Sequence, residues 1–159
     1  MNKPALLKKI IAELEKKIAL YVGAANAAHA EATHEESKAE DKYDTRGLEA
    51  SYLAAGQSRQ MAETAAALQQ FVSLKLRKFS ASDAIDLTAL VELETKTGST
   101  IYFLGPAAGG TEIVHEKKTV LVITPNSPLG QQLAGKKQGD RLKMKIGGFL
   151  NDYRIASVA

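Results

Sequence analysis

The most informative feature of the sequence is a heptad pattern in its first part. No proline occurs between Pro4 and Pro106, so long helices can run there without interruption. Within residues 5–36, apolar or alanine side chains recur in alternating steps of four and three: Leu7, Ile11, Leu14, Ile18, Tyr21, Ala25, Ala28 and Ala32. This spacing is typical of a helix packed against one partner helix. We therefore predict a helix over 5–36.

A second helix is predicted from about residues 46–48 to about residue 78. Its apolar positions fall out of register near Gly56, where we expect a local distortion; they are Leu48, Tyr52, Ala55, Met61, Ala65, Leu68, Val72 and Leu76. Two such helices fold back on each other as an antiparallel coiled-coil hairpin. About 30 residues in each arm would give a length of about 45 Å.

An acidic stretch lies between the two predicted helices. Residues 35–49 hold six acidic and three basic side chains, so the tip of the hairpin would be acidic. On a regular helix Asp44 and Glu49 point about 140° apart, whereas Asp41 and Asp44 share a face. Such a cluster is often only a solvated turn. The alternative is that it delivers carboxylates to a partner.

The character of the sequence changes around residues 79–83. Short β-favouring runs follow, separated by turn residues, over 91–95, 100–104, 113–114, 119–124, 141–146 and 150–158. Ser127 followed by Pro128 is a helix start, and Gly135 is a helix stop. We predict an α+β chain: a helical hairpin over 1–80, then a small antiparallel β domain over 81–159 with one short helix.

Composition narrows the functional classes. The chain has no cysteine, which excludes disulfides and cysteine-based zinc sites. His29, His34 and His115 lack metal-ligand spacing. The sequence predicts no signal peptide and no membrane span, and we expect a cytoplasmic monomer. The net charge of +3 does not by itself indicate nucleic-acid binding.

The segment SPLGQQLAGKKQGD (127–140) resembles the signature of the C-terminal domain of bacterial GreA/GreB-type transcription elongation (transcript cleavage) factors. The resemblance covers nearly the whole chain, since a helical hairpin followed by a β-rich domain is that family's architecture. It implies an FKBP-like C-terminal domain that docks on RNA polymerase. The residues expected to form or shape that surface are Ser127, Pro128, Gly130, Gly135, Lys136, Gly139 and Asp140.

The resemblance also implies a role for the hairpin tip. In that family the hairpin enters the polymerase secondary channel, and the tip acids help to hold a second Mg²⁺ for cleavage of backtracked RNA. Asp44, Glu49 and Asp41 are the candidate Mg²⁺ ligands here. The chain would be an accessory factor rather than an enzyme. It would bind no cofactor stably, share Mg²⁺ with the polymerase, and meet nascent RNA only indirectly.

The tip departs from the family pattern, Asp-x-x-Glu-Asn-x-x-Tyr followed by alanines. With Tyr52 aligned to the family tyrosine, Leu48 and Thr45 occupy the two acidic positions, and Asp44 and Glu49 flank them. Leu48 and Tyr52 are expected to pack beneath the tip. The departure favours an alternative, a regulator that binds the channel without stimulating cleavage. A more remote alternative is an FKBP-like peptidyl-prolyl isomerase.

A basic cluster ends the signature and continues beyond it, comprising Lys136, Lys137, Arg141, Lys143 and Lys145. One interpretation is a charged, solvated face of the sheet. The other is contact with an acidic polymerase surface or with RNA.

Overall fold

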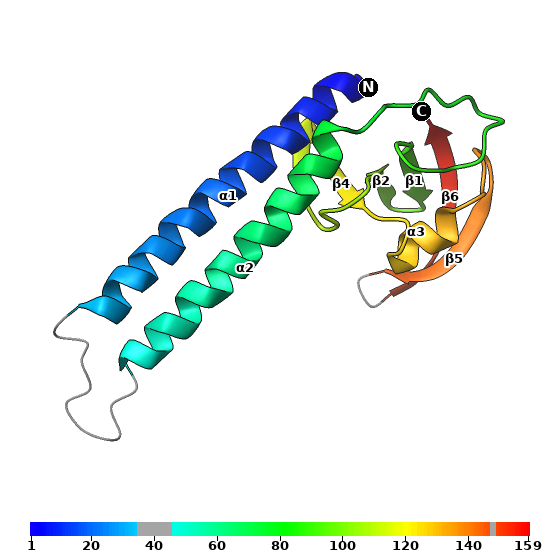
Figure 1. Ribbon diagram of the computed structural model, residues 1–159. Helices are drawn as coiled ribbons and strands as arrows, with labels where there is room; N and C mark the ends of the chain where they lie inside the picture. The colour runs from blue at the N-terminus through cyan, green and yellow to red at the C-terminus, as the bar shows by residue number, and fades with distance from the viewer. Residues whose placement is uncertain (35–45, 147–148) are drawn as a thin grey trace. The chain divides into compact units, whose positions relative to one another are not determined.

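The computed structural model describes residues 1–34, 46–146 and 149–159, without the side chains of 46, 146 and 149–151. Two helices, α1 (Lys3–Thr33) and α2 (Arg46–Val72), precede a six-stranded sheet and a short helix, α3 (Pro128–Leu133) (Figure 1). The predicted α+β fold class is confirmed. None of the described helices is long and apolar enough to cross a membrane. The chain forms two compact units, Ala12–Gln69, and Met1–Ile11 together with Gln70–Ala159.

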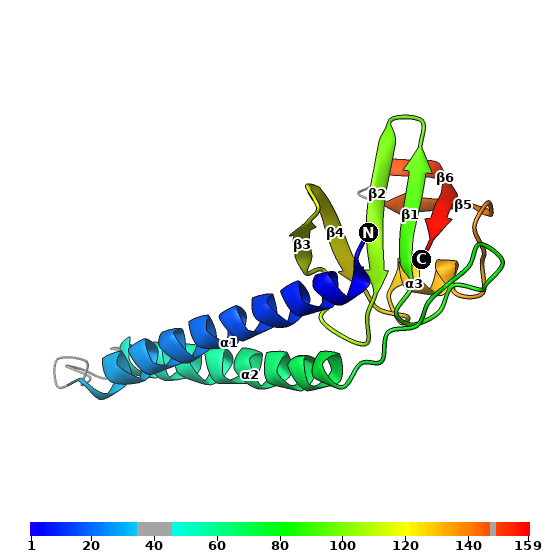
Figure 2. The ribbon, with the colours of Figure 1, turned by 90° about the horizontal axis from the view of Figure 1, so that it is seen from above.

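Within the unit Ala12–Gln69, α1 and α2 lie side by side (Figures 1 and 2). The heptad pattern of α1 is confirmed, because every predicted position is at least partly buried and Leu14 and Ala28 are fully so. The intervening positions at 22–24, 26–27 and 29–31 are exposed. From Leu14 onward the four-three spacing marks the packed face of α1 correctly. Before Leu14, the fully buried side chains are Leu6 and Ile10, each one residue ahead of the predicted Leu7 and Ile11.

The packed face of α2 differs from the prediction. Leu48, Tyr52 and Val72 are 54, 70 and 61% exposed, so their predicted packing is wrong. A regular three-four spacing of buried or partly buried positions is found instead at Gly47, Ala50, Ala54, Gln57, Met61, Thr64, Leu68 and Phe71, with Ala65 and Ala67 also buried or partly buried. The predicted Met61, Ala65 and Leu68 are therefore on the packed face. Up to Gln57 this face consists of small and polar residues, so a search for large apolar side chains chose the wrong stripe in that half of the helix. The expected distortion at Gly56 is also absent, since α2 is continuous there.

The second helix ends at Val72, earlier than the expected residue 78. Beyond it, the backbone finds partners outside a helix. The Arg77 N–H donates to Thr88 Oγ1 at 3.0 Å, and the Arg77 carbonyl accepts from Lys3 Nζ. These long-range bonds replace the bonds that a continued helix would make.

The sheet has the strand order β3-β4-β2-β1-β6-β5. All neighbouring strands are antiparallel except β2 and β4, which are parallel. The strands are β1 (Leu90–Thr95), β2 (Gly98–Leu104), β3 (Glu112–His115), β4 (Lys118–Ile123), β5 (Arg141–Ile146) and β6 (Phe149–Val158). Each falls where a β-favouring run was found, because turn residues separate the runs. The main core includes Val91, Tyr102, Ile155 and Leu133 of α3.

The other face of β2 and β4 is buried too. Phe103, Val120 and Val122 alternate along the strands with residues of the main core. Phe71 is fully buried, and a Cβ added at Gly105 would lie 2.8 Å from its ring and 3.1 Å from Val122. Leu6 and Ile10 of α1 are fully buried in the same unit. The helix ends thus belong to the folded β unit.

Candidate functional site

The signature segment 127–140 begins with a tightly closed turn. Ser127 caps α3: its Oγ accepts from the Gly130 N–H at 3.0 Å and donates to the Thr124 carbonyl at 2.7 Å. Pro128 occupies the first turn of the helix, where a missing N–H leaves nothing unpaired. A Cβ at Gly130 would lie 2.0 Å from the Thr124 oxygen. Only glycine therefore fits this position.

The second half of the signature is fixed by backbone bonds. Gly135 and Gly139 have φ of +77° and +93°, a region that favours glycine. Ile85 exchanges two bonds with this segment: its N–H donates to the Lys136 carbonyl at 2.8 Å, and its carbonyl accepts from Gly135 at 3.2 Å. The Asp140 carboxylate accepts from the Lys137 N–H at 2.9 Å. The signature is a rigid structural unit.

All seven predicted docking residues thus have an internal role in this unit, that of Lys136 being through its carbonyl. Pro128 and Lys137 present exposed side chains, while Lys136 is partly buried. Contact between these residues and a partner stays a prediction.

Of the three candidate Mg²⁺ ligands at the tip, Asp41 and Asp44 lie outside the described residues. Glu49 is in the first turn of α2 with an exposed side chain, where a negative charge suits the helix dipole. Leu48 and Tyr52 are exposed beside it, which contradicts their expected packing beneath the tip. Whether the three carboxylates converge stays a prediction. Within 1–34, 46–146 and 149–159, no three acidic or histidine side chains form a group that could hold a metal ion.

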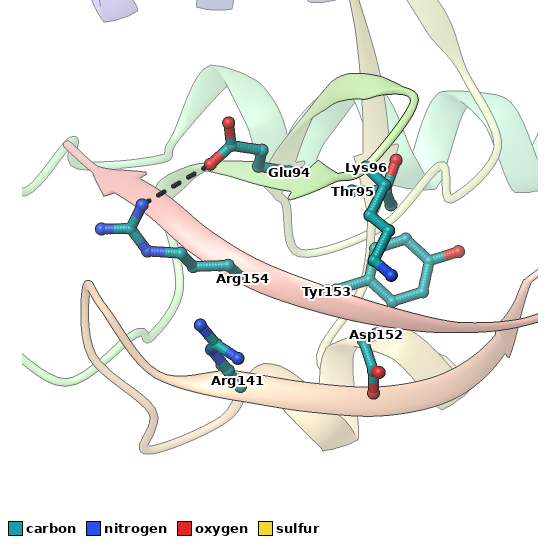
Figure 3. A pocket seen from close by; sticks show the side chains of 7 residues that line it. All are labelled: Glu94, Thr95, Lys96, Arg141, Asp152, Tyr153 and Arg154. Atoms are coloured by element: carbon teal, nitrogen blue, oxygen red, sulfur yellow. Dashed lines mark ion pairs between the residues drawn. The ribbon is translucent and has the colours of Figure 1, made fainter.

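The basic cluster extends further than the sequence indicated. Arg141, Lys143 and Lys145 alternate along β5 with the core-packed Leu142 and Met144, so they share the face away from the main core. On the neighbouring strand Arg154 lies opposite Arg141. A groove of about 250 Å³ there is lined by Glu94, Thr95, Lys96, Arg141, Asp152, Tyr153 and Arg154 (Figure 3). Arg154 joins the cluster through strand pairing, and Lys96, in the turn after β1, lines the same groove; no local pattern could reveal either.

An isomerase-like pocket finds no support among the described side chains. Such a site needs accessible aromatic walls, and Tyr102 and Phe103 are 5 and 0% exposed. Tyr153 is also buried, at 8% exposure, although it lies at one wall of the charged groove.

No family model and no curated protein matches this chain. It is similar to solved structures of Gre-type factors. GreA factor homolog 1 (Gfh1) of Thermus thermophilus has 18% identity over 94% of each chain, with a TM-score of 0.39. Gfh1 of Thermus aquaticus has 20% identity over 92% of each chain, with a TM-score of 0.40. A prokaryotic transcription elongation factor GreA/GreB from Nitrosomonas europaea has 18% identity, covers 65% of this chain and 78% of its own, and scores 0.37.

Proposed function

We propose that this protein is an RNA polymerase-binding transcription elongation factor of the GreA/GreB type. The observation that carries the proposal is the 127–140 signature, combined in one chain with two long paired helices and an acidic connection. The β unit would dock on the polymerase, and the helix pair would enter the secondary channel. In this role the protein is an accessory factor, and the polymerase performs the chemistry.

The tip acids would act by completing a metal site in the polymerase. Mg²⁺ is held by one or two carboxylates together with substrate phosphates, and two-metal phosphodiester cleavage places the ions about 4 Å apart. A carboxylate from Asp44 or Glu49, with Asp41 in reserve, would supply the ligand that the second ion lacks. The ion belongs to the joint site, so no stable binding to the isolated factor is required.

A second function in the same channel is binding without stimulated cleavage. It is favoured by Leu48, which stands where the family pattern has an acid and presents an apolar side chain that is 54% exposed. Thr45 replaces the other acid. A tip of this kind would occupy the channel while contributing fewer metal ligands.

The test removes the tip charges and keeps side-chain volume. Asp44→Asn combined with Glu49→Gln should leave capture of core polymerase unchanged, because solvated surface charges contribute little to docking. The same variant should reduce RNA cleavage in backtracked complexes to the polymerase's own rate at limiting Mg²⁺. Glu15→Gln with Glu63→Gln is the matched control, since both side chains are exposed on the helices. The control should stimulate cleavage by the polymerase as the wild type does.

Three results would change the proposal. A wild-type protein that slows elongation without stimulating cleavage would establish the channel-binding function instead. Normal cleavage by the Asp44→Asn, Glu49→Gln variant would move the ligand role to Asp41 or to the polymerase itself. Failure of the wild-type protein to bind polymerase would remove both functions.

A further inference from the structure

The outer face of β1, β6 and β5 carries a cluster of positive charge. We call it the cationic face, defined by Lys96, Arg141, Lys143, Lys145 and Arg154. Two carboxylates, Glu94 and Asp152, lie among these five cations, whereas Glu92 on the same face of β1 is paired with Lys118 of β4. Five minus two leaves an excess of three positive charges within the cationic face.

Ion pairs neutralise this face only in part. Arg154 lies 3.7 Å from Glu94, and Lys143 lies 3.7 Å from Asp152. Arg141 is directly opposite Arg154 in the strand register and has no ion pair among the described residues. Like charges directly opposite each other are destabilising. An anion bound between the two guanidinium groups would relieve that repulsion, and both groups line the groove (Figure 3).

Protection of an edge strand explains only part of this arrangement. β5 is at the edge of the sheet, and lysines on edge strands prevent pairing with other chains. Arg154 is on β6, which is paired on both sides. Lys96 directly follows β1, which is also paired on both sides. Neither of these two cations guards an edge.

We propose that the cationic face binds the phosphate backbone of single-stranded RNA. Alternate residues of a strand are about 6.8 Å apart, so Arg141, Lys143 and Lys145 form an evenly spaced row. Such a row suits a polymer with one charge at each repeat better than it suits the irregular carboxylates of a protein surface. The guanidinium groups of Arg141 and Arg154 match phosphate geometry. The choice of RNA rests on the proposed function, in which the factor acts on complexes that hold backtracked RNA.

The binding follows from charge alone and is independent of base sequence. The aromatic side chains that the structure describes on the sheet are buried, and although Tyr153 lines the groove, base stacking is expected to contribute little. Phosphate contacts position a nucleic acid without reading its sequence. We therefore expect the affinity for RNA to fall strongly as the salt concentration rises.

The experiment measures fluorescence anisotropy of a labelled oligouridylate of about 20 nucleotides with the full chain. The test variant combines Arg141→Thr, Lys143→Thr and Lys145→Thr, which keep β propensity at exposed positions. The control variant, Lys8→Gln, Lys16→Gln and Arg59→Gln, removes the same charge from exposed helix positions. Circular dichroism verifies that each variant is folded.

Binding by the test variant should be on the order of a hundredfold weaker at about 50 mM salt. The slope of log K against log salt should become shallower by about 2, which is about 0.7 for each lost phosphate contact. The control variant should bind like the wild type. Equal losses in both variants, or no RNA binding by the wild type, would overturn the proposal.

Two further arms identify the ligand. Binding of an oligothymidylate with similar affinity supports backbone contact, whereas binding of DNA without RNA would overturn the assignment to RNA. If polyglutamate displaces RNA at equal charge concentration, the ligand of the cationic face would be an acidic protein and not RNA. Polymerase capture is measured separately with the same variants. If the test variant loses RNA binding but still captures polymerase, the cationic face binds RNA independently of polymerase docking. If the wild type binds RNA but fails to capture polymerase, the proposed function is wrong and the RNA-binding inference stands.

Discussion

Lys3 shows how a single residue can tie distant parts of the chain together. Its Nζ donates to the carbonyls of Arg77 and Thr88, the latter at 3.1 Å, and lies 4.9 Å from the centre of the Phe79 ring. The side chain is buried, and burial lowers its pKa below the ordinary 10.5. No local pattern predicts this role, because the partners lie more than 70 positions away in the sequence.

Lys3→Met should lower the free energy of unfolding by about 1–3 kcal/mol, since a buried carbonyl (Thr88) and a partly buried one (Arg77) lose their donor. Lys8→Met, at an exposed position of the same helix, should change it little. Urea unfolding followed by circular dichroism measures both. Equal stability of the two variants would show that the Lys3 contacts contribute nothing.

Lys3 also makes the free energy of unfolding depend on pH. Because the pKa of Lys3 is lower in the folded chain, the unfolded chain binds the proton more tightly. The free energy of unfolding should therefore rise with pH in the window just below 10.5, as the folded form loses its charge. This rise should be smaller in Lys3→Met, when the two urea series are compared across that range.

At the scale of elements, sequence patterns predicted the strands better than the packing of the helices. Each strand of the β unit is bounded by turn residues, and Ser127, Pro128 and Gly135 mark the short helix correctly. The packed face of the first half of α2 escaped prediction because small and polar residues, such as Gly47 and Gln57, carry its repeat there. The spacing was in the sequence, but its residue types were not apolar.

Two glycines in the helices provide a test at this scale. Gly23 and Gly56 are helical, and an added Cβ at either would meet nothing within 4 Å. Gly23→Ala and Gly56→Ala should each raise the free energy of unfolding by about 0.5–1 kcal/mol. A midpoint rise of about 2–4 °C per kcal/mol is expected in thermal unfolding.

Gly130→Ala provides the opposite control. The added Cβ would lie 2.0 Å from a backbone oxygen, so this variant should lose about 3 kcal/mol or more. A neutral effect at Gly130, or a loss of stability at Gly23 and Gly56, would contradict the described backbone.

For the whole molecule, the compact unit that holds the sheet also includes Met1–Ile11 and the chain from Gln70. Leu6, Ile10 and Phe71 are all 0% exposed. Hydrophobic patterning located the helices and the sheet separately. It could not show that the helix ends are buried in the same unit as the face of β2 and β4 that lies away from the main core. That assignment depends on contacts between segments far apart in the sequence.

A fragment of residues 81–159 should therefore unfold less cooperatively than a fragment in which residues 1–11 are joined by a flexible linker to 70–159. Without Phe71, the side of the sheet holding Val122 and Gly105 loses its cover. Thermal unfolding and binding of a hydrophobic dye measure the difference. Equal midpoints and equal dye binding would show that the helix ends add no stability.

The close approach of Gly130 to the Thr124 oxygen also bears on how proteins of this architecture are classified. A motif that the backbone requires for folding can persist through any change of activity, because losing it would cost the fold itself. The 127–140 segment therefore does not distinguish between the two proposed functions, stimulated cleavage and channel binding without cleavage. The two proposed functions have to be distinguished by residues that the fold does not constrain. Leu48 is one such residue, because its side chain is exposed on the helix.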